Sequence, residues 1–225
     1  MLAIAFAVVA ASVSAPGETP PLWGGAQAWS SYANTFTDPD MGTNASWLFN
    51  YHYDQARNAS LWQHLEGQHD WVCSLGSPNA TARGAPCNVI HATDGWLYIA
   101  FPSMTQCCKC TDDPAMGIVK ADWLRHPEVQ YLGAETVNGV EADHWFLQTN
   151  YTSYDNHYYS TRGQQRPVRF MEHIQGQEKK WDFNMGAYEA GDVFPALLVP
   201  PNNCDAPCDV IKAPGGYPGC TWRGR

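Results

Sequence analysis

Basic residues are scarce in this 225-residue chain: 13 Lys and Arg stand against 22 Asp and Glu, which gives a formal charge of −9. A negative surface repels polyanions, so we expect no nucleic-acid partner. Long hydrophobic runs are also rare. After the first fifteen residues, no segment approaches the ~18 apolar residues that cross a bilayer, and we therefore expect no stable membrane insertion.

Motifs of nucleophilic, nucleotide-binding and metalloprotease chemistry are missing as well. The sequence holds no G-x-S-x-G, H-E-x-x-H, P-loop or G-x-G-x-x-G pattern. Two carboxylates near a well-defined turn, Glu135 and Glu141, should point to opposite faces of their hairpin and so do not form a glycosidase-type pair. The sequence therefore predicts no catalytic residue, no metal and no cofactor. Each of the eight histidines is interpreted as solvated or locally hydrogen-bonded.

The first fifteen residues are uncharged, largely apolar, and end in small residues. These features are typical of a secretory signal peptide. We predict a signal peptide over residues 1–15, with its cut site left open by Pro16, and a flexible N-terminal arm over 16–45. A single β-rich domain follows over 46–200. A tail rich in Cys, Pro and Gly, stapled by disulfides, covers 201–225.

Glycosylation sequons support export to the cell exterior or to the lumen of the secretory pathway. The four N-x-S/T sites are at Asn44, Asn58, Asn79 and Asn150. A glycan needs a solvated attachment point, so these asparagines should lie at the surface.

The cysteine pattern points to the same compartment. The eight cysteines are Cys73, Cys87, Cys107, Cys108, Cys110, Cys204, Cys208 and Cys220. An even number in an exported chain predicts up to four disulfides, and an oxidising compartment disfavours the alternative, a zinc site. Cys73 and Cys87 should close the loop between them. Adjacent cysteines rarely bond each other, so Cys107 and Cys108 should find partners in the tail.

The clearest structural signal is Asn138-Gly139 between two runs that alternate apolar and polar residues. Asn-Gly favours a type I′ turn, because both central residues need positive φ. A two-residue loop then sets the register of the hairpin. The predicted pairs are Val137 with Val140, Leu132 with Trp145, and Tyr131 with Phe146.

Other segments predict further strands, and helix is scarce. The expected strands cover residues 47–53, 61–70, 88–92, 96–101, 153–160, 168–174 and 180–188, and a short helical turn is expected at 120–125. Successive hairpins with one or a few short helices indicate a mainly β fold. We predict a curved antiparallel sheet, a half-barrel, with a β-sandwich as the alternative.

One set of residues resembles a known family. The set comprises Cys110, residues 117–124, 131–145, 158–159, 166–169 and 194–200, and Cys204. It resembles uncharacterised secreted proteins of plants and protists that are related to the LolA-type lipoprotein carriers and the ependymins. The resemblance implies a curved sheet wrapped around helices, with an apolar cavity for a lipid or another hydrophobic molecule.

Three functions follow from these observations. The first is a secreted glycoprotein that binds a hydrophobic, lipid-like ligand in the cavity of the sheet. The second is a structural matrix or cell-surface protein. The third is a glycan-binding or carbohydrate-active protein, suggested by ten Trp and eleven Tyr. Under the first interpretation, five residues that the predicted register places on one face of the hairpin would contact the ligand. They are Tyr131, Val137, Val140, Ala142 and Phe146.

Overall fold

The computed structural model describes residues 19–37, 46–67, 72–73, 84–111, 118–148, 154–174, 177–206 and 208. The predicted signal peptide, three of the four sequon asparagines (Asn44, Asn79 and Asn150) and Cys220 lie outside these residues. The fourth, Asn58, is exposed in the turn that follows a strand, as a glycan acceptor requires. Within the described part of the chain, no helix has the length and apolar character needed to cross a membrane.

The described residues form strands and short 3-10 turns. The strands are β1 Ala28–Thr37, β2 Ser46–Asp54, β3 Ala59–His64, β4 Cys87–His91, β5 Leu97–Phe101, β6 Gln106–Thr111, β7 Gln130–Val137, β8 Val140–Gln148, β9 Tyr154–Thr161, β10 Pro167–Ile174, β11 Gln177–Asp182 and β12 Tyr188–Ala190. The turns are η1 Trp23–Gly25, η4 Pro102–Met104, η6 Trp123–Arg125, η7 Met185–Ala187 and η8 Pro195–Leu198.

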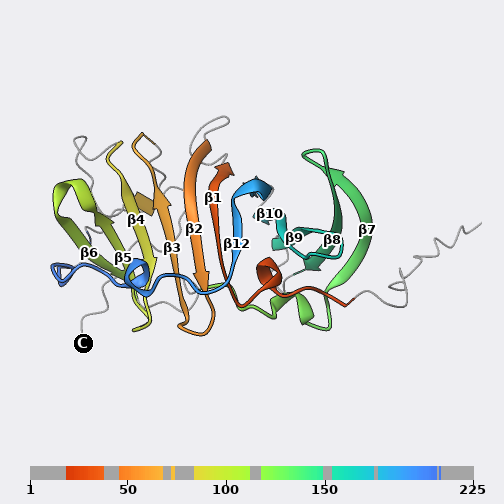
Figure 1. Cartoon of the computed structure of the whole chain (residues 1–225), viewed down its shortest axis with the longest axis horizontal. Coiled ribbons are helices and arrows are strands. Elements are labelled where there is room, and N and C mark those ends of the chain that lie inside the picture. Colours follow the sequence, from red (N-terminus) through yellow and green to blue (C-terminus); the bar gives the residue numbers. More distant parts are fainter. Residues whose placement is uncertain are drawn as a thin grey trace, which may run out of the picture.

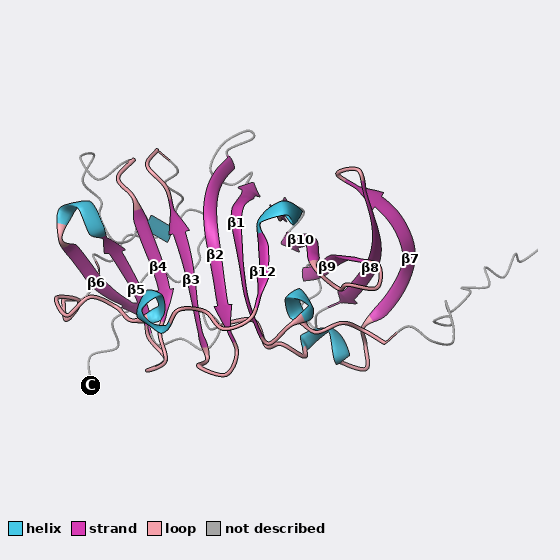
Figure 2. Ribbon diagram, in the orientation of Figure 1, coloured by secondary structure: helices cyan, strands magenta, loops and turns pink. Residues whose placement is uncertain are grey.

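All strands belong to one 12-stranded sheet in the order β6-β5-β4-β3-β2-β1-β11-β10-β9-β8-β7, with β12 pairing to β1 beside this path. Figure 1 shows the strands side by side, with β7 to β10 bending away from the rest. Every strand pair is antiparallel. The predicted fold class, a curved antiparallel sheet with few short helices, is confirmed (Figure 2).

The predicted N-terminal arm is in part wrong. Residues 28–37 form β1, which lies in the middle of the sheet between β2 and β11. Trp29 on this strand is fully buried, as is Ser31 two residues later on the same face. The many small and polar residues of this segment concealed its strand character. Two smaller differences are that the Cys107–Cys110 cluster lies in β6, and that the 180–188 strand is divided by η7.

The Asn-Gly hairpin is confirmed, but its register changes along the strands. Asn138 and Gly139 have φ of 51° and 79°, and Val137 pairs with Val140 as predicted. A bulge then follows between Tyr131 and Gly133, where Gly133 has φ of 114°. Tyr131 therefore pairs with Trp145 and Gln130 with Phe146, in place of the predicted pairs.

The strands β3–β6 and the tail residues 193–208 make up what we call the disulfide half. One apolar cluster lies on each face of its strands. The tail crosses one of these faces (Figure 1), where Val193 and Leu198 pack against Leu61 and Ile90. Burial on both faces explains why β5, Leu97–Phe101, is buried along its whole length.

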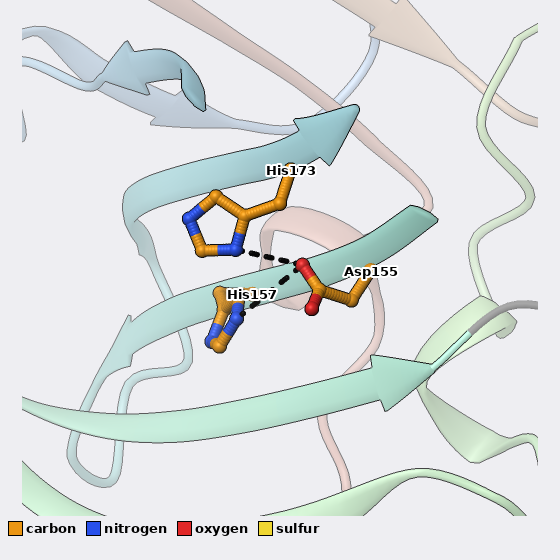
Figure 3. Close-up of side chains that lie close together, drawn as sticks. All are labelled: Asp155, His157 and His173. Atoms are coloured by element: carbon orange, nitrogen blue, oxygen red, sulfur yellow. Dashed lines mark ion pairs between the residues drawn. The ribbon is translucent and has the colours of Figure 1, made fainter. Parts of the chain in front are cut away.

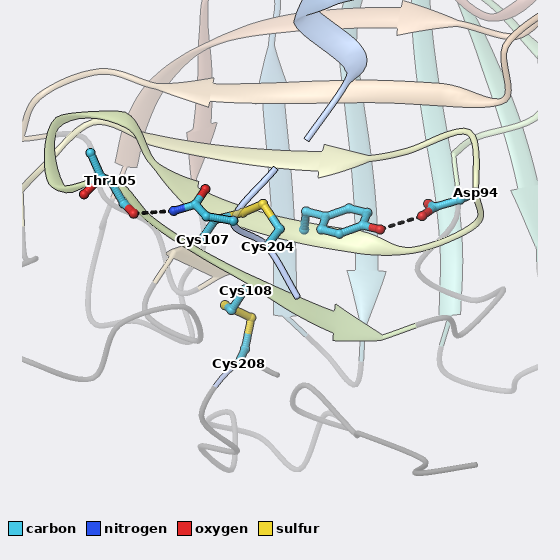
Figure 4. Close-up of a disulfide and its surroundings, with 8 residues drawn as sticks. Asp94, Thr105, Cys107, Cys108, Cys204 and Cys208 are labelled. Carbon is cyan, nitrogen blue, oxygen red and sulfur yellow. Dashed lines mark hydrogen bonds between the residues drawn. A yellow bond between two sulfur atoms is a disulfide. The ribbon is translucent and has the colours of Figure 1, made fainter. Parts of the chain in front are cut away.

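Disulfides close this half, and the predicted pairings are confirmed. Cys73 bonds Cys87 across 14 positions, and the tail is held by two bonds, Cys107–Cys204 and Cys108–Cys208 (Figure 4). Cys110 is also disulfide-bonded. Because the two tail bonds come from neighbouring residues of β6, they fix the tail to that edge strand. Backbone bonds between Lys109 and residues 206 and 208 add to this attachment.

The strands β7–β11 make up what we call the histidine half. Its two faces differ in chemistry. The aromatic face carries an unbroken row of register-paired rings, Tyr131, Trp145, Tyr158, Phe170 and Trp181. The opposite face, which we call the histidine face, carries His144, His157 and His173 on the alternating positions.

Candidate functional site

The aromatic face is covered by two irregular segments, residues 19–27 and 118–129, which we call the cap. Trp23 of the cap is 3% exposed and lies at the centre of the aromatic cluster. Its ring centroid lies 5.1 Å from that of Tyr158 and 5.5 Å from that of Phe170. Leu124, which is fully buried, joins it from the second segment. The side chains of the cap thus occupy the space over this face.

Polar contacts fix the cap to the sheet. The hydroxyl of Tyr53 donates to the carbonyl of Val119 at 2.7 Å, and the amide of Ala121 donates to Gln55 Oε1 at 2.7 Å. The amide of Gly24 donates to the Tyr158 hydroxyl at 3.2 Å. Burial raises the pKa of Tyr53 and Tyr158 far above the ordinary range, so both hydroxyls stay protonated as hydrogen-bonding groups.

A polar cavity of about 230 Å³ opens where the cap meets the ends of β8 and β9. Its lining residues come from the N-terminal segment, from the two strands and from the turn after β9. They are Thr19, Pro21, Asp143, Trp145, Ser160, Arg162, Gly163 and Gln165. β8 and β9 bring Asp143 and Ser160 together, because these residues are direct partners in the ladder.

Charges of both signs meet at this cavity. Arg162 donates to Glu141 at 3.0 Å, and its Nε lies 3.3 Å from Asp143 Oδ1. Tyr131 donates to the same Asp143 oxygen at 2.9 Å. The cavity therefore offers a carboxylate, a guanidinium, a hydroxyl and an amide on its wall. Such a set suits a ligand group that is hydroxylated or zwitterionic.

Trp145 connects the cavity to the aromatic cluster. Its ring belongs to the cluster and lies 5.0 Å from that of Tyr131, while the same residue lines the cavity. Its indole N–H is buried and has no hydrogen-bond partner among the described residues. A buried donor without a partner costs about 1–3 kcal/mol. A ligand acceptor or a water molecule at this position would remove that cost.

Four of the five residues predicted to contact a ligand share the histidine face, and Tyr131 does not. The bulge in β7 puts Tyr131 on the aromatic face. Val137 and Ala142 are 5% and 0% exposed, and with Val140 they pack in a small separate cluster. Phe146 lies on the histidine face, with its ring 5.0 Å from that of His157. The prediction of a shared face therefore holds for Val137, Val140, Ala142 and Phe146. It fails for Tyr131, because it used a register without the bulge.

The sequence did not predict which residues line the polar cavity. Only Trp145 belonged to a group that had been noted, the unusually many Trp and Tyr residues. Asp143 and Ser160 stand in strands that were predicted separately, and nothing local in either sequence shows that they are partners. Arg162 and Gly163 lie in the turn after β9, and no sequence motif marks them as ligand-binding residues. The available signal was the polar residue Asp143 on the same side of the predicted strand as Trp145.

Comparison with family models finds no match, and comparison with curated proteins finds none either. Several solved structures are similar. An uncharacterised conserved protein from Thermus thermophilus is 10% identical, with a TM-score of 0.47 over 80% of this chain and 90% of that one. A LolA-superfamily protein from Nitrosomonas europaea is 12% identical, with a TM-score of 0.37 over 78% of this chain and 90% of that one.

A third similar structure is a putative outer membrane lipoprotein-sorting protein domain from Vibrio parahaemolyticus. It is 6% identical, with a TM-score of 0.34 over 72% of this chain and 85% of that one. At these identities and TM-scores, the likeness decides neither a ligand nor an activity for this chain. The relation to plant, protist and ependymin proteins stays a prediction.

Proposed function

We propose that this chain is an exported, disulfide-bonded glycoprotein that binds an amphipathic ligand. The polar head of the ligand occupies the cavity at Asp143 and Arg162, and its apolar part lies against the aromatic face beneath the cap. The observation that carries the proposal is the double position of Trp145, which belongs to the aromatic cluster and to the wall of the polar cavity.

The size of the cavity limits what it can hold. Ligand sites for whole drug-sized molecules are usually about 300–1,000 Å³. A cavity of about 230 Å³ suits a head group the size of a single sugar or a small zwitterion, and not a whole lipid. The remainder of a larger ligand must therefore find a second surface.

The N-terminal segment is the partition between the two regions. Thr19 and Pro21 line the cavity, and Trp23, two residues further, packs in the aromatic cluster. Outward movement of residues 19–23 would join the cavity to the apolar surface of the cluster. This movement breaks the bond from the Trp23 amide to the Ala121 carbonyl, which is 2.7 Å long.

The experiment is to identify what the protein carries when it is secreted by eukaryotic cells and purified without detergent. Native mass spectrometry counts bound molecules, and organic extraction followed by mass spectrometry identifies them. We expect one non-covalent adduct that contains both a polar head and an apolar chain. Arg162→Ala should weaken binding by ~10–100-fold, because a hydrogen bond to a charged group is worth about 1.5–3 kcal/mol.

Two variants serve as references for that result. Trp145→Phe keeps the ring and removes the N–H, and should weaken binding by about 3–10-fold. Lys120→Ala removes one exposed charge from the cap and should leave binding unchanged. Protein that carries no adduct and gains none from lipid extracts or glycolipids would contradict the proposal. Binding of free sugars alone, without an apolar part, would favour the glycan-binding function.

A further inference from the structure

Three histidines that lie far apart in the sequence meet on the histidine face. β8 alternates its side chains, so Asp143 and Trp145 reach the aromatic face while His144 points the other way. The β8–β9 ladder pairs His144 with Tyr159, one same-face position from His157. The β9–β10 ladder pairs His173 with Asp155, on the other side of His157. The interpretation of each histidine as solvated or only locally hydrogen-bonded therefore does not hold for these three.

Two carboxylates fix the ends of this row. Glu135 Oε1 on β7 lies 2.6 Å from His144 Nδ1, and His144 Nε2 lies 2.8 Å from His157 Nδ1. At the other end, Glu178 Oε2 on β11 lies 3.5 Å from His173 Nε2. We call His157 Nδ1 and His173 Nε2 the outer nitrogens of the two rings. Each of them lies next to a group that can accept its proton, His144 Nε2 for the first and Glu178 for the second.

The inner nitrogens of the same two rings converge on one carboxylate oxygen. His173 Nδ1 lies 2.7 Å from Asp155 Oδ1, and His157 Nε2 lies 3.7 Å from it (Figure 3). This oxygen is buried, and no donor among the described residues reaches it with the geometry of a hydrogen bond. A buried polar atom without a hydrogen bond requires an explanation, and a bound ion is one.

The proton positions that satisfy the outer contacts leave lone pairs at the centre. If His144 donates through Nδ1 to Glu135, then its Nε2 accepts from His157 Nδ1, and His157 Nε2 carries a lone pair. If His173 donates through Nε2 to Glu178, then its Nδ1 carries a lone pair as well. Two lone pairs and a carboxylate oxygen then face one another. Such an arrangement repels itself unless a cation stands between the three atoms.

We propose that Asp155, His157 and His173 bind one divalent transition-metal ion of the zinc type. One donor atom from each residue lies within 4.8 Å of those of the other two. Ligands at 2.0–2.1 Å from a tetrahedral zinc ion are about 3.3 Å apart, which falls between the two distances to Asp155 Oδ1. Two imidazoles and a carboxylate suit zinc better than calcium or magnesium, which prefer oxygen ligands.

The surroundings of the three residues match those of metal sites. A histidine that binds a metal generally donates a hydrogen bond from its second ring nitrogen. For His157 the acceptor is His144, which is itself held by Glu135. For His173 the acceptor is Glu178. Three protein ligands leave a fourth position for water or another molecule.

The turn between β7 and β8 is fixed to β10 and β11 at the other end of the histidine face. Asn138, in the turn between β7 and β8, donates to Asp182 at the end of β11 and accepts from Arg169 of β10. The hairpin therefore reaches over β9 toward the histidine face. The side chains of His157, Asp155 and His173 are 16%, 33% and 36% exposed, so an ion can reach their donor atoms from the solvent.

The test uses the full secreted chain without a histidine tag, freed of metal by a chelator. Zinc is titrated in competition with a chromophoric chelator, and cobalt is added separately to read the coordination from its visible spectrum. We expect one ion per chain and a four-coordinate cobalt spectrum. Asp155→Asn and His173→Gln should each weaken zinc binding by about 100-fold or more, and His144→Gln by about 10-fold.

The matched control is His126→Gln, which removes an exposed histidine that also lies next to a carboxylate, Glu128. It should leave the affinity and the cobalt spectrum unchanged. Circular dichroism verifies that each variant is folded. No binding at micromolar zinc, or binding that Asp155→Asn and His173→Gln leave intact, would overturn the proposal. If no zinc binds, a proton shared by His173 and Asp155 holds the cluster together.

Discussion

The disulfide half and the histidine half belong to one sheet and use their faces differently. In the disulfide half both faces of β3–β6 are apolar, and the bonds Cys73–Cys87, Cys107–Cys204 and Cys108–Cys208 hold the chain around them. In the histidine half one face is aromatic and the other carries imidazoles and carboxylates. Here the cap is held by hydrogen bonds and ring contacts. The polar groups that can bind a ligand or an ion therefore gather in the half that depends on non-covalent packing.

The physical reason lies in the cost of burying polar groups. Imidazoles and carboxylates that are half-buried lower stability unless they are paired. The cross-linked and doubly buried strands of the other half supply stability that does not depend on these groups. The histidine half has two polar sites, the cavity at Asp143 on the aromatic face and the histidine cluster on the other. They are separate because alternate residues of β8 point to opposite faces.

The largest loss of stability should come from the cap, which holds the histidine half by non-covalent contacts alone. In Gly24→Ala, the new Cβ would lie 2.2 Å from Trp29 Nε1, at a φ of +65°. Trp29 is fully buried, and its ring packs against those of Trp23, Tyr51 and Phe183. We expect a loss of about 3–5 kcal/mol in the free energy of unfolding, measured with urea. Gly139→Ala, at φ of +79° with nothing within 4 Å of the new Cβ, should lose only about 1 kcal/mol.

The disulfides should rank in an order opposite to their sequence separations. Replacing Cys73 and Cys87 by Ala opens a loop of 14 positions that no other described bond closes, at a cost of about 3 kcal/mol. Replacing Cys107 and Cys204 by Ala should cost about 2 kcal/mol although their separation is 97, because Cys108–Cys208 still closes nearly the same loop. Urea unfolding measures both. A larger loss for the longer loop would show that the two tail bonds act independently.

Acid should weaken the histidine half more than the disulfide half. Burial lowers the pKa of His52, His144 and His157 in the folded chain. As the pH falls, the unfolded chain binds these protons before the folded chain does. The free energy of unfolding is therefore highest above about pH 6.5 and decreases below it. Each group contributes a slope of at most ~1.4 kcal/mol per pH unit.

Unfolding midpoints between pH 7 and pH 5, in the presence of a chelator, measure this slope. His52 on β2 bonds Ser30 at 2.7 Å and lies outside the histidine half. His52→Gln should keep most of the slope, and the double variant His144→Gln/His157→Gln should lose most of it. Equal slopes in all three proteins would contradict the assignment.

The smallest effect concerns the bend of the histidine half. Asn138→Gly keeps a residue that favours positive φ and removes the bonds to Asp182 and Arg169, which are 2.9 Å and 3.0 Å long. Both bonds are exposed, so the free energy of unfolding should fall by less than about 1 kcal/mol. Amide hydrogen exchange at the turn should become faster. Asn202→Gly, in an exposed turn of the tail, should change neither quantity.

Much of the fold could be predicted from local signals. The Asn-Gly turn and the alternating aromatic residues indicated the strands, and the cysteine spacing indicated the disulfides. Three features could not be predicted. The strand over residues 28–37 has few apolar residues, and the bulge at Gly133 has no local signal beyond the glycine itself. The third feature is the histidine cluster, which depends on the registers of β8, β9 and β10 together.

Those registers explain why the histidine site was missed. The β9–β10 ladder shifts between Pro167 and Arg169, so counting residues from the turn at Arg162-Gly163 does not bring His157 and His173 to the same side. Only the complete set of pairs places Asp155 between them. The aromatic face was easier to anticipate, because its rings were recognisable as apolar wherever the register placed them.

The central claim is that the histidine face binds a metal ion and the aromatic face does not. The most direct test is a nitrogen NMR spectrum of the histidine side chains recorded while zinc is added. We predict that Nε2 of His157 and Nδ1 of His173 shift as one ion binds, while His52 and His126 stay unchanged. The indole N–H signal of Trp145, on the aromatic face, should also stay in place. Zinc-dependent shifts at His126, or none at His157 and His173, would contradict the metal site.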